Sequence, residues 1–202
     1  MGKALSEMTL EELWELFPIV LTEHREEWVG WYADEEKRLV GILPQKGIRI
    51  SHMGSTAIRG ISAKPIIDIL VELPLSVSME SVKEMLTSSG YLCMAETANR
   101  KSFNMGYTSE GFAEKVFHLH LRYFGDNDEL YFCDYMNDDP VLAKQYEALK
   151  LSLAETFKHN RDGYTAAKTD FIKEQTEKAK KYYGHKYRLK QNAGYNGSYI
   201  YG

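Results

Sequence analysis

The chain has 202 residues, of which 44% are hydrophobic and 27% charged, and its formal net charge is -4. This composition allows one globular domain and argues against a general nucleic-acid binder, whose affinity rests on clustered lysine and arginine. No apolar run approaches the length of a membrane span, and the two cysteines have no pairing pattern. We therefore expect a cytoplasmic protein without a membrane partner and without general nucleic-acid binding.

The N-terminal part of the chain has a helical pattern. Thr9 and Glu12 form a capping-box signature, and the apolar stripe that follows predicts a helix that ends before residue 18. A second helical pattern runs over residues 25–43. We interpret residues 1–18 as an extra N-terminal helix on a single domain that spans residues 1–183.

Two strand patterns come next. Ile48–His52 alternates, and Ile66–Val71 is almost continuously apolar, as in a strand buried on both faces. Asp68 is the single acid inside the second pattern, and a buried carboxylate needs a partner, a metal or an open strand end. Glu72 is about 13 Å further along, too far to share a metal with Asp68, and is predicted to be a solvated strand end. We expect the two strands to be neighbours and Asp68 to face the same cleft as His120.

The rest of the chain mixes strands and helices. The predicted elements are a helix at 79–89, strands at 91–95, 102–107 and 115–123, and helices at 129–137, 140–157 and 164–183. Short connections in the middle and helices at both ends indicate an α+β fold with a mixed β-sheet flanked by helices. Residues 184–202 are rich in Tyr, Gly and Asn without periodicity, which predicts a flexible or partner-binding tail.

The segment between the first two strands has the residue types of a phosphate-binding turn. Gly54 lets the backbone approach a ligand closely, and Ser55 and Thr56 add hydroxyl and N–H groups. Lys64 supplies a positive charge just before the strand that carries Asp68. We predict that these turn residues and Lys64 bind phosphate. A solvated loop lysine is the alternative for Lys64, and a structural carboxylate that caps the turn is the alternative for Asp68.

The run H-M-G-S-T-A-I-R-G-I, followed by A-K-P-I-I-D-I, resembles the signature of the GrpB family, which is grouped with the DNA polymerase β-like nucleotidyltransferases. The resemblance covers about residues 19–178 and implies a nucleotidyltransferase-like fold. In that superfamily a glycine–serine pair precedes a strand with two acids separated by one residue. Gly54, Ser55 and Asp68 match this pattern, whereas Leu70 stands where the second acid would be.

The predicted strand at 115–123 carries basic residues in alternation. Alternation places His118, His120 and Arg122 on one face of the strand, and two imidazoles about 6.6 Å apart at their Cα atoms can converge on a metal or a phosphate. We predict a divalent metal (Mg, Mn or Zn) held by Asp68, His118 and His120, with Arg122 as a phosphate contact. The mixed nitrogen and oxygen ligands suit Mn or Zn better than Mg.

A further basic and aromatic group lies late in the chain. Tyr164 and Lys168 are four residues apart and share a helical face, and Arg161 comes shortly before them. The GrpB family shows a similar spacing of arginine, tyrosine and lysine. A contribution to the site and a simple clamp between helices both remain open for these residues.

Three hypotheses of function follow from these residues. The first, which the resemblance implies, is metal-assisted transfer of a nucleoside monophosphate to an unknown acceptor, with Asp68 and Lys64 as catalytic residues. The second, favoured by Leu70, is a catalytically silent module that binds a nucleotide or a phosphorylated small molecule. The third is a phosphohydrolase of the histidine-triad kind, against which Arg122 counts because it replaces a third histidine.

Overall fold

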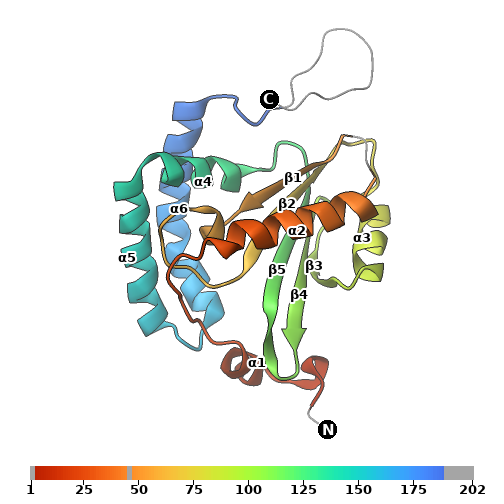
Figure 1. The fold of residues 1–202 in the computed structure, drawn as a ribbon, viewed down its shortest axis with the longest axis horizontal. Coiled ribbons are helices and arrows are strands. Elements are labelled where there is room, and N and C mark those ends of the chain that lie inside the picture. Colours follow the sequence, from red (N-terminus) through yellow and green to blue (C-terminus); the bar gives the residue numbers. More distant parts are fainter. Residues whose placement is uncertain (1–2, 45–46, 189–202) are drawn as a thin grey trace.

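The computed structural model describes residues 3–44 and 47–188, in which one mixed sheet is flanked by helices (Figure 1). The predicted α+β architecture is confirmed. Most of the predicted tail, residues 189–202, lies outside the described residues. Each element predicted from the sequence is present, with ends that differ by a few residues.

Five strands form the sheet within the described residues. They are β1 (Arg49–Met53), β2 (Ile67–Leu73), β3 (Leu92–Glu96), β4 (Arg100–Thr108) and β5 (Gly111–Tyr123). The helices are α1 (Leu10–Leu16), α2 (Glu27–Ile42), α3 (Met79–Ser88), α4 (Asp128–Asp138), α5 (Pro140–Thr156) and α6 (Arg161–Tyr183), with short 3-10 turns η1 (Leu5–Glu7) and η2 (Ser55–Ala57).

The strand order is β1-β2-β5-β4-β3, and β2 and β5 pair in parallel while the other neighbours are antiparallel. The prediction that β1 and β2 are neighbours is confirmed. In the parallel pair Asp68 lies opposite His118, and Leu70 lies opposite His120. Because paired residues share a face of the sheet, this register brings the acid and both histidines to one side.

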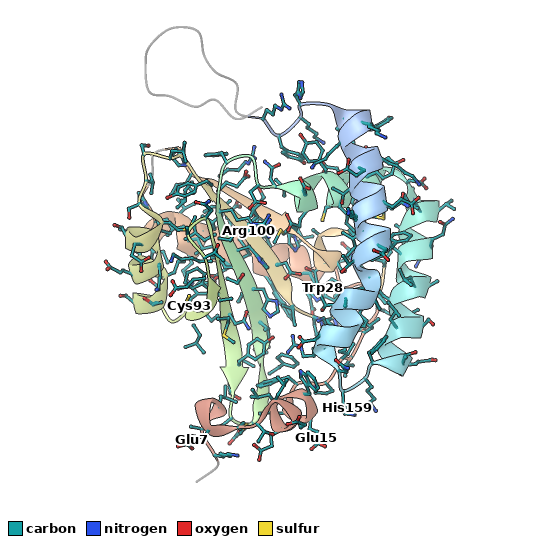
Figure 2. All side chains as sticks on the ribbon, turned by 180° about the vertical axis from the view of Figure 1, so that it is seen from behind. Glu7, Glu15, Trp28, Cys93, Arg100 and His159 are labelled. Atoms are coloured by element: carbon teal, nitrogen blue, oxygen red, sulfur yellow. The ribbon has the colours of Figure 1, made fainter. Side chains whose placement is uncertain are left out.

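The two faces of the sheet are covered by different helices. One face packs against α2 and α3, with a core that includes Trp28, Leu39, Ile69, Val82, Leu86 and Leu119. The other face packs against α4 and α5, with a core that includes Met53, Ile58, Leu70, Leu130, Met136 and Tyr146. Figures 1 and 2 show α5 and α6 side by side, on the opposite side of the molecule from α3. The functional candidates on β2 and β5 therefore face the layer of α4, α5 and α6.

The turn after β1 depends on a glycine. Gly54 has φ +73°, and a Cβ atom there would lie 2.9 Å from Cβ and Cγ of Asp68. Only a residue without a side chain allows both this backbone conformation and the close approach of the carboxylate. The turn and the acid of β2 are thus packed directly against each other.

An irregularity in the β4–β5 pairing redirects an aromatic side chain. Met105 pairs with Phe117 whereas Tyr107 pairs with Phe112, so β5 has three more residues than β4 between these pairs, and Gly106 at this point of β4 has φ +90°. Regular alternation along β4 would place Tyr107 on the face that carries α2 and α3. The irregularity turns it to the other face, where its hydroxyl reaches the ring of His118.

Glu72 is fully buried, so the prediction of a solvated strand end was wrong. Its carboxylate accepts hydrogen bonds from Arg49, at 2.6 Å, and from the side-chain amide of Asn127, at 2.9 Å. The backbone carbonyl of Tyr187 accepts from the same arginine, and the Tyr187 ring packs on Tyr131 with centroids 5.0 Å apart. This buried ion pair is structural and also attaches the chain that follows α6.

The tight contact at the turn after β1 gives a stability prediction. Gly54→Ala should lower the free energy of unfolding by more than about 2 kcal/mol, because strain at positive φ adds to a clash with Asp68. The matched control is Gly60→Ala, since Gly60 has φ +71° but a Cβ atom there would have no heavy atom within 4 Å. Urea unfolding measures both variants, and equal losses would contradict a role for the contact with Asp68.

Candidate functional site

A positively charged cavity of about 380 Å³ lies beside the N-terminal end of β2, and we call it the basic pocket. Its walls come from β2, β5, the loop before β2, α5 and the first turns of α6. Its charged and histidine lining residues are Lys64, Asp68, His118, His120, Lys150, Arg161, Asp162 and Lys168. The pocket thus combines one carboxylate of the sheet with cations from three other segments.

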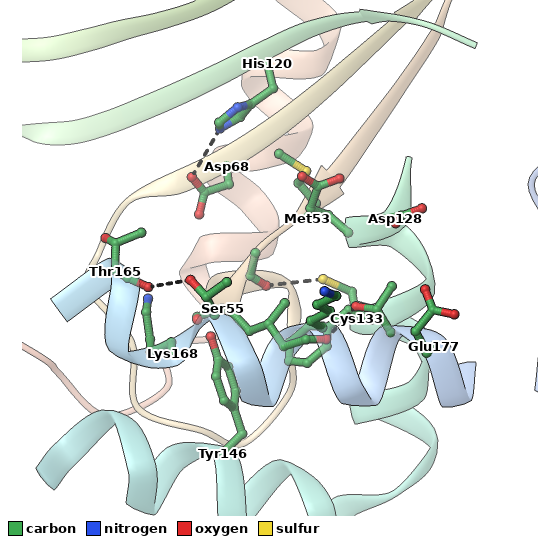
Figure 3. Close-up of a pocket in the computed structure, with 17 residues that line it drawn as sticks. Met53, Ser55, Asp68, His120, Asp128, Cys133, Tyr146, Thr165, Lys168 and Glu177 are labelled. Atoms are coloured by element: carbon green, nitrogen blue, oxygen red, sulfur yellow. Dashed lines mark hydrogen bonds and ion pairs between the residues drawn. The ribbon is translucent and has the colours of Figure 1, made fainter. Parts of the chain in front are cut away.

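A larger cavity of about 540 Å³, which we call the apolar pocket, adjoins the basic pocket (Figure 3). Phe132, Cys133 and Tyr146 from α4 and α5 line it. Asp68 and Lys168 line both cavities, and Figure 3 shows Lys168 reaching from α6 toward Asp68. A single ligand can therefore occupy both cavities, with a charged part in one and an uncharged part in the other.

Asp68 is held between the turn and the two histidines. Its Oδ1 lies 3.4 Å from His118 Nδ1 and 4.0 Å from His120 Nε2. Burial by itself raises the pKa of the Asp68 carboxyl, but the hydrogen bond and charge of His118, followed by His120 and Lys64, outweigh burial and lower its pKa. Asp68 is therefore an anion at neutral pH. Burial also lowers the pKa of His120, which favours its neutral form.

A chain of hydrogen bonds fixes the ring of His118. Arg161 Nη2 donates to the Tyr107 hydroxyl at 3.0 Å, and that hydroxyl lies 2.8 Å from His118 Nε2. The Tyr107 hydroxyl can donate to Nε2 while it accepts from Arg161, and in that arrangement Nδ1–H of His118 faces Asp68. The contacts thus suit the Nδ1–H tautomer of His118 and place a partner at each of its nitrogens.

Three lysines of the basic pocket have strongly lowered pKa values. Burial, and then the charges of Arg161 and Lys168, lower the pKa of Lys64 to about 7. Burial, and then the charge of Lys168, lowers the pKa of Lys150 to about 7, and burial lowers the pKa of Lys168 to about 8. Near neutral pH these lysines are only partly protonated. A bound anion would raise their pKa values, so the lysines would take up protons when the anion binds.

The structure brings together most of the residues predicted for the site. Gly54 and Ser55 line the apolar pocket, and Ser55 also lines the basic pocket with the predicted Lys64, Asp68, His118 and His120. Asp68 and His120 face the same cavities, as predicted.

Two predicted phosphate contacts do not join these pockets. The hydroxyl of Thr56 donates to the carbonyl of Ile66 at 3.1 Å, and its side chain is buried beneath the turn. Arg122 binds Glu129 through two hydrogen bonds of 2.8 Å and lines neither pocket. Its guanidinium charge is paired with Glu129 of α4, so the contacts of both residues in this structure support the fold.

The predicted three-residue metal site is not formed. Across residues 3–44 and 47–188, no group of three or more His, Cys, Asp or Glu side chains is placed to hold a metal ion. His118 contacts the Tyr107 hydroxyl through Nε2 and Asp68 through Nδ1, and Leu70 lies fully buried in the apolar core at the position of the missing second acid. Of the three predicted ligands, Asp68 and His120 remain, and any metal they held would need water or ligand oxygens to complete its coordination.

Sequence reasoning missed two residues of the site. Lys150 reaches the basic pocket from α5 and is almost fully buried, yet its sequence position is one of many lysines at helical spacing. Tyr107 reaches His118 only because of the irregularity at Gly106. A glycine inside a strand pattern is the one signal that could have pointed to the irregularity.

The comparisons with known proteins agree with this architecture. The family model "GrpB protein" matches residues 18–196. The chain belongs to the GrpB family. It is 35% identical over 161 residues to the glutamate-rich protein GrpB of Alkalihalophilus pseudofirmus, covering 77% of this chain and 92% of that protein. It is 30% identical to the UPF0157 protein YqkA of Bacillus subtilis, covering 79% of this chain but only 46% of that longer protein.

Solved structures extend the likeness beyond the GrpB family. The crystal structure of GrpB from Enterococcus faecalis has a TM-score of 0.70 at 29% identity and covers 81% of this chain and 99% of that chain. The Cid1 poly(U) polymerase with Mg and 3'-dATP bound has a TM-score of 0.50 at 11% identity and covers 78% of this chain and 51% of that chain. The fold of this GrpB protein is therefore nucleotidyltransferase-like. None of the described helices has the length and apolar character needed to cross a membrane.

The hydrogen-bond chain through His118 gives a spectroscopic prediction. In the wild type, long-range ¹H–¹⁵N spectra should show His118 protonated at Nδ1 and unprotonated at Nε2. Tyr107→Phe removes the hydrogen bond at Nε2, so the Nε2 ¹⁵N resonance of His118 should shift, whereas Asp68 keeps the proton on Nδ1. Tyr32→Phe is the matched control, because the Tyr32 hydroxyl donates to Glu36 instead. An unchanged His118 signal in Tyr107→Phe would contradict the assigned chain.

Proposed function

We propose that this GrpB protein binds the phosphate groups of a nucleotide or another phosphorylated small molecule in the basic pocket. The observation that carries the proposal is the meeting of Lys64, Lys150, Arg161 and Lys168 in one cavity beside Gly54 and Ser55. Phosphate is recognised by clustered cations and by backbone N–H groups at the start of a helix, and the first turns of α6 line this cavity.

The apolar pocket supports a ligand with an uncharged part. Its volume of about 540 Å³ and its aromatic residues Phe132 and Tyr146 suit a ring system such as a nucleoside. The relationship to the Cid1 fold agrees with a nucleotide, because that structure holds 3'-dATP. Binding fits the pockets better than transfer does, since Leu70 replaces an acid that metal-assisted transfer would use.

Transfer of a nucleoside monophosphate to an unknown acceptor is the second candidate function. The placement of Asp68 directly against the Gly54 turn favours it, because this part of the nucleotidyltransferase pattern is intact. In this candidate Asp68 and Lys64 act on the phosphates, and a divalent metal would have Asp68 and His120 as its protein ligands. His118 already contacts Tyr107 through Nε2 and Asp68 through Nδ1, so it would have to give up one of these contacts to join them.

The pKa values of the pocket lysines predict how anion binding depends on pH. Protonated lysine binds the anion, so affinity is highest below the pKa values of Lys64 and Lys150, about 7, and falls as pH rises through the pKa of Lys168, about 8. Sulfate keeps a constant charge in this range, and its affinity should fall by on the order of tenfold or more between pH 6.5 and 8.5, since each lysine of pKa about 7 loses most of its protons over this range. Asp68, with its lowered pKa, stays charged throughout.

Isothermal titration calorimetry in buffers of different ionisation enthalpy measures both the sulfate affinity and the protons taken up on binding. Uptake of protons should be largest near pH 7.5, where the free lysines are partly neutral. The absence of sulfate binding, or an affinity that does not change with pH, would contradict a phosphate site built on these lysines.

Transfer is tested by pyrophosphate release. Each of the four ribonucleoside triphosphates is incubated with the protein and Mg²⁺, Mn²⁺ or Zn²⁺, and pyrophosphate is measured against the Asp68→Asn variant. Transfer predicts release that depends on Asp68, with water as a slow acceptor. If wild type and Asp68→Asn release the same amount with every metal, transfer fails as a function and binding remains.

A further inference from the structure

The cations of the basic pocket have no carboxylate partners within the part of the chain that the structure describes. Of the ion pairs formed among these residues, none includes Lys64, Lys150, Arg161 or Lys168, although Lys178 and Lys180 on the same helix α6 are paired with Glu174 and Asp128. Unpaired cations in a half-buried cavity are unusual, because burial penalises a charge without a counter-ion. The unpaired state of these four residues therefore points to an anion that the described chain does not itself supply.

Aromatic rings take the place of carboxylates around these cations. Lys64 and Lys168 lie 5.5 and 4.2 Å from the ring centroid of Tyr164, and Lys150 lies 4.8 Å from that of Tyr146. A ring stabilises an ammonium group more weakly than a carboxylate does and leaves its charge available. Lys150 is nearly fully buried and donates to the carbonyl of Ser62, which holds its ammonium group at the pocket wall.

The balance of charge in the pocket is positive. Asp68 and Asp162 are the acids that line it, against four cationic side chains and the positive end of the α6 dipole. Metal-assisted phosphate sites have a different arrangement, in which one or two carboxylates hold the metal and the metal meets the phosphate. Here the second carboxylate is replaced by Leu70, and both nitrogens of His118 are engaged.

We propose that the basic pocket binds the phosphates of its ligand directly, without a bridging divalent metal, through Lys64, Lys150, Arg161 and Lys168. The four side chains supply the positive charge that a metal ion supplies in other phosphate sites. The inference rests on the proposed phosphate-binding function and specifies the form of its ligand, which is the free polyphosphate anion and not its magnesium chelate. Chelation removes charge from a diphosphate, so Mg²⁺ should weaken binding.

Calorimetric titration of the full chain with pyrophosphate and with ADP tests this proposal, with EDTA in one series and millimolar Mg²⁺ in the other. Both ligands should bind in EDTA, and Mg²⁺ should weaken the binding several-fold. Lys168→Gln should weaken binding in EDTA on the order of tenfold, because it removes one charge-assisted contact. Lys178→Gln is the matched control on the same helix and should bind as the wild type does.

The possible results distinguish failure of the metal-free inference from failure of the proposed phosphate-binding function. Binding that requires Mg²⁺ or Mn²⁺ would overturn the metal-free inference and leave phosphate binding intact. Absence of binding in both series would overturn the proposed function itself. Wild-type affinity in Lys168→Gln, with circular dichroism showing a folded variant, would place the ligand elsewhere and also overturn the inference. Lys64→Gln is a second variant for the same test, because Lys64 lies in the loop before β2 and not in α6.

Discussion

A single carboxylate on the central parallel strand pair governs the site. Asp68 packs so closely against Gly54 that no side chain fits between them, and its other side meets His118. A half-buried anion in this position needs positive or hydrogen-bonding neighbours, and its lowered pKa shows that these neighbours outweigh the effect of burial. The turn, the register of β2 with β5 and the orientation of His118 are all linked through this one group.

The sheet supplies the acid, whereas the helical layer supplies the cations. Lys150 and Lys168 come from α5 and α6, which pack on the face of the sheet that carries Asp68. Arg161 at the start of α6 has two roles, since it lines the basic pocket and donates to Tyr107. A ligand that draws Arg161 toward its phosphates would weaken that donation and so change the hydrogen bonding of His118. The ligand pocket and the Asp68–His118 pair are physically coupled through this arginine.

Much of this arrangement follows from local patterns in the sequence. Strand alternation is sufficient to place His118 and His120 on one face, and the apolar run around Asp68 is sufficient to predict a central strand. Glu72 could not be interpreted in the same way, because its burial depends on Arg49 and on Asn127 just before α4, which are distant in sequence. Strand periodicity describes a face of the sheet but does not say what covers it.

Arg122 is a second residue for which strand periodicity predicts the face of the sheet but not the partner of the side chain. It shares the face of His118 and His120, as alternation predicts, but it lies beyond the pocket and opposite α4, where Glu129 binds it. Tyr107 shows the converse, because strict alternation would assign it to the wrong face and the irregularity at Gly106 reverses that assignment.

Leu70 connects the fold to the chemistry of the pocket. In a nucleotidyltransferase-like sheet its side chain occupies the position from which a second acid would help Asp68 to hold a metal. Here it is fully buried among Met53, Leu130 and Met136, so the apolar core of α4 extends to the edge of the site. A carboxylate at this position would be buried among apolar side chains, with His120 on the neighbouring strand as the group opposite it, and burial of a charge costs free energy. The packing that stabilises this half of the protein therefore opposes a two-acid metal clamp, and the positive charge of the site comes from the lysines and the arginine on the opposite wall.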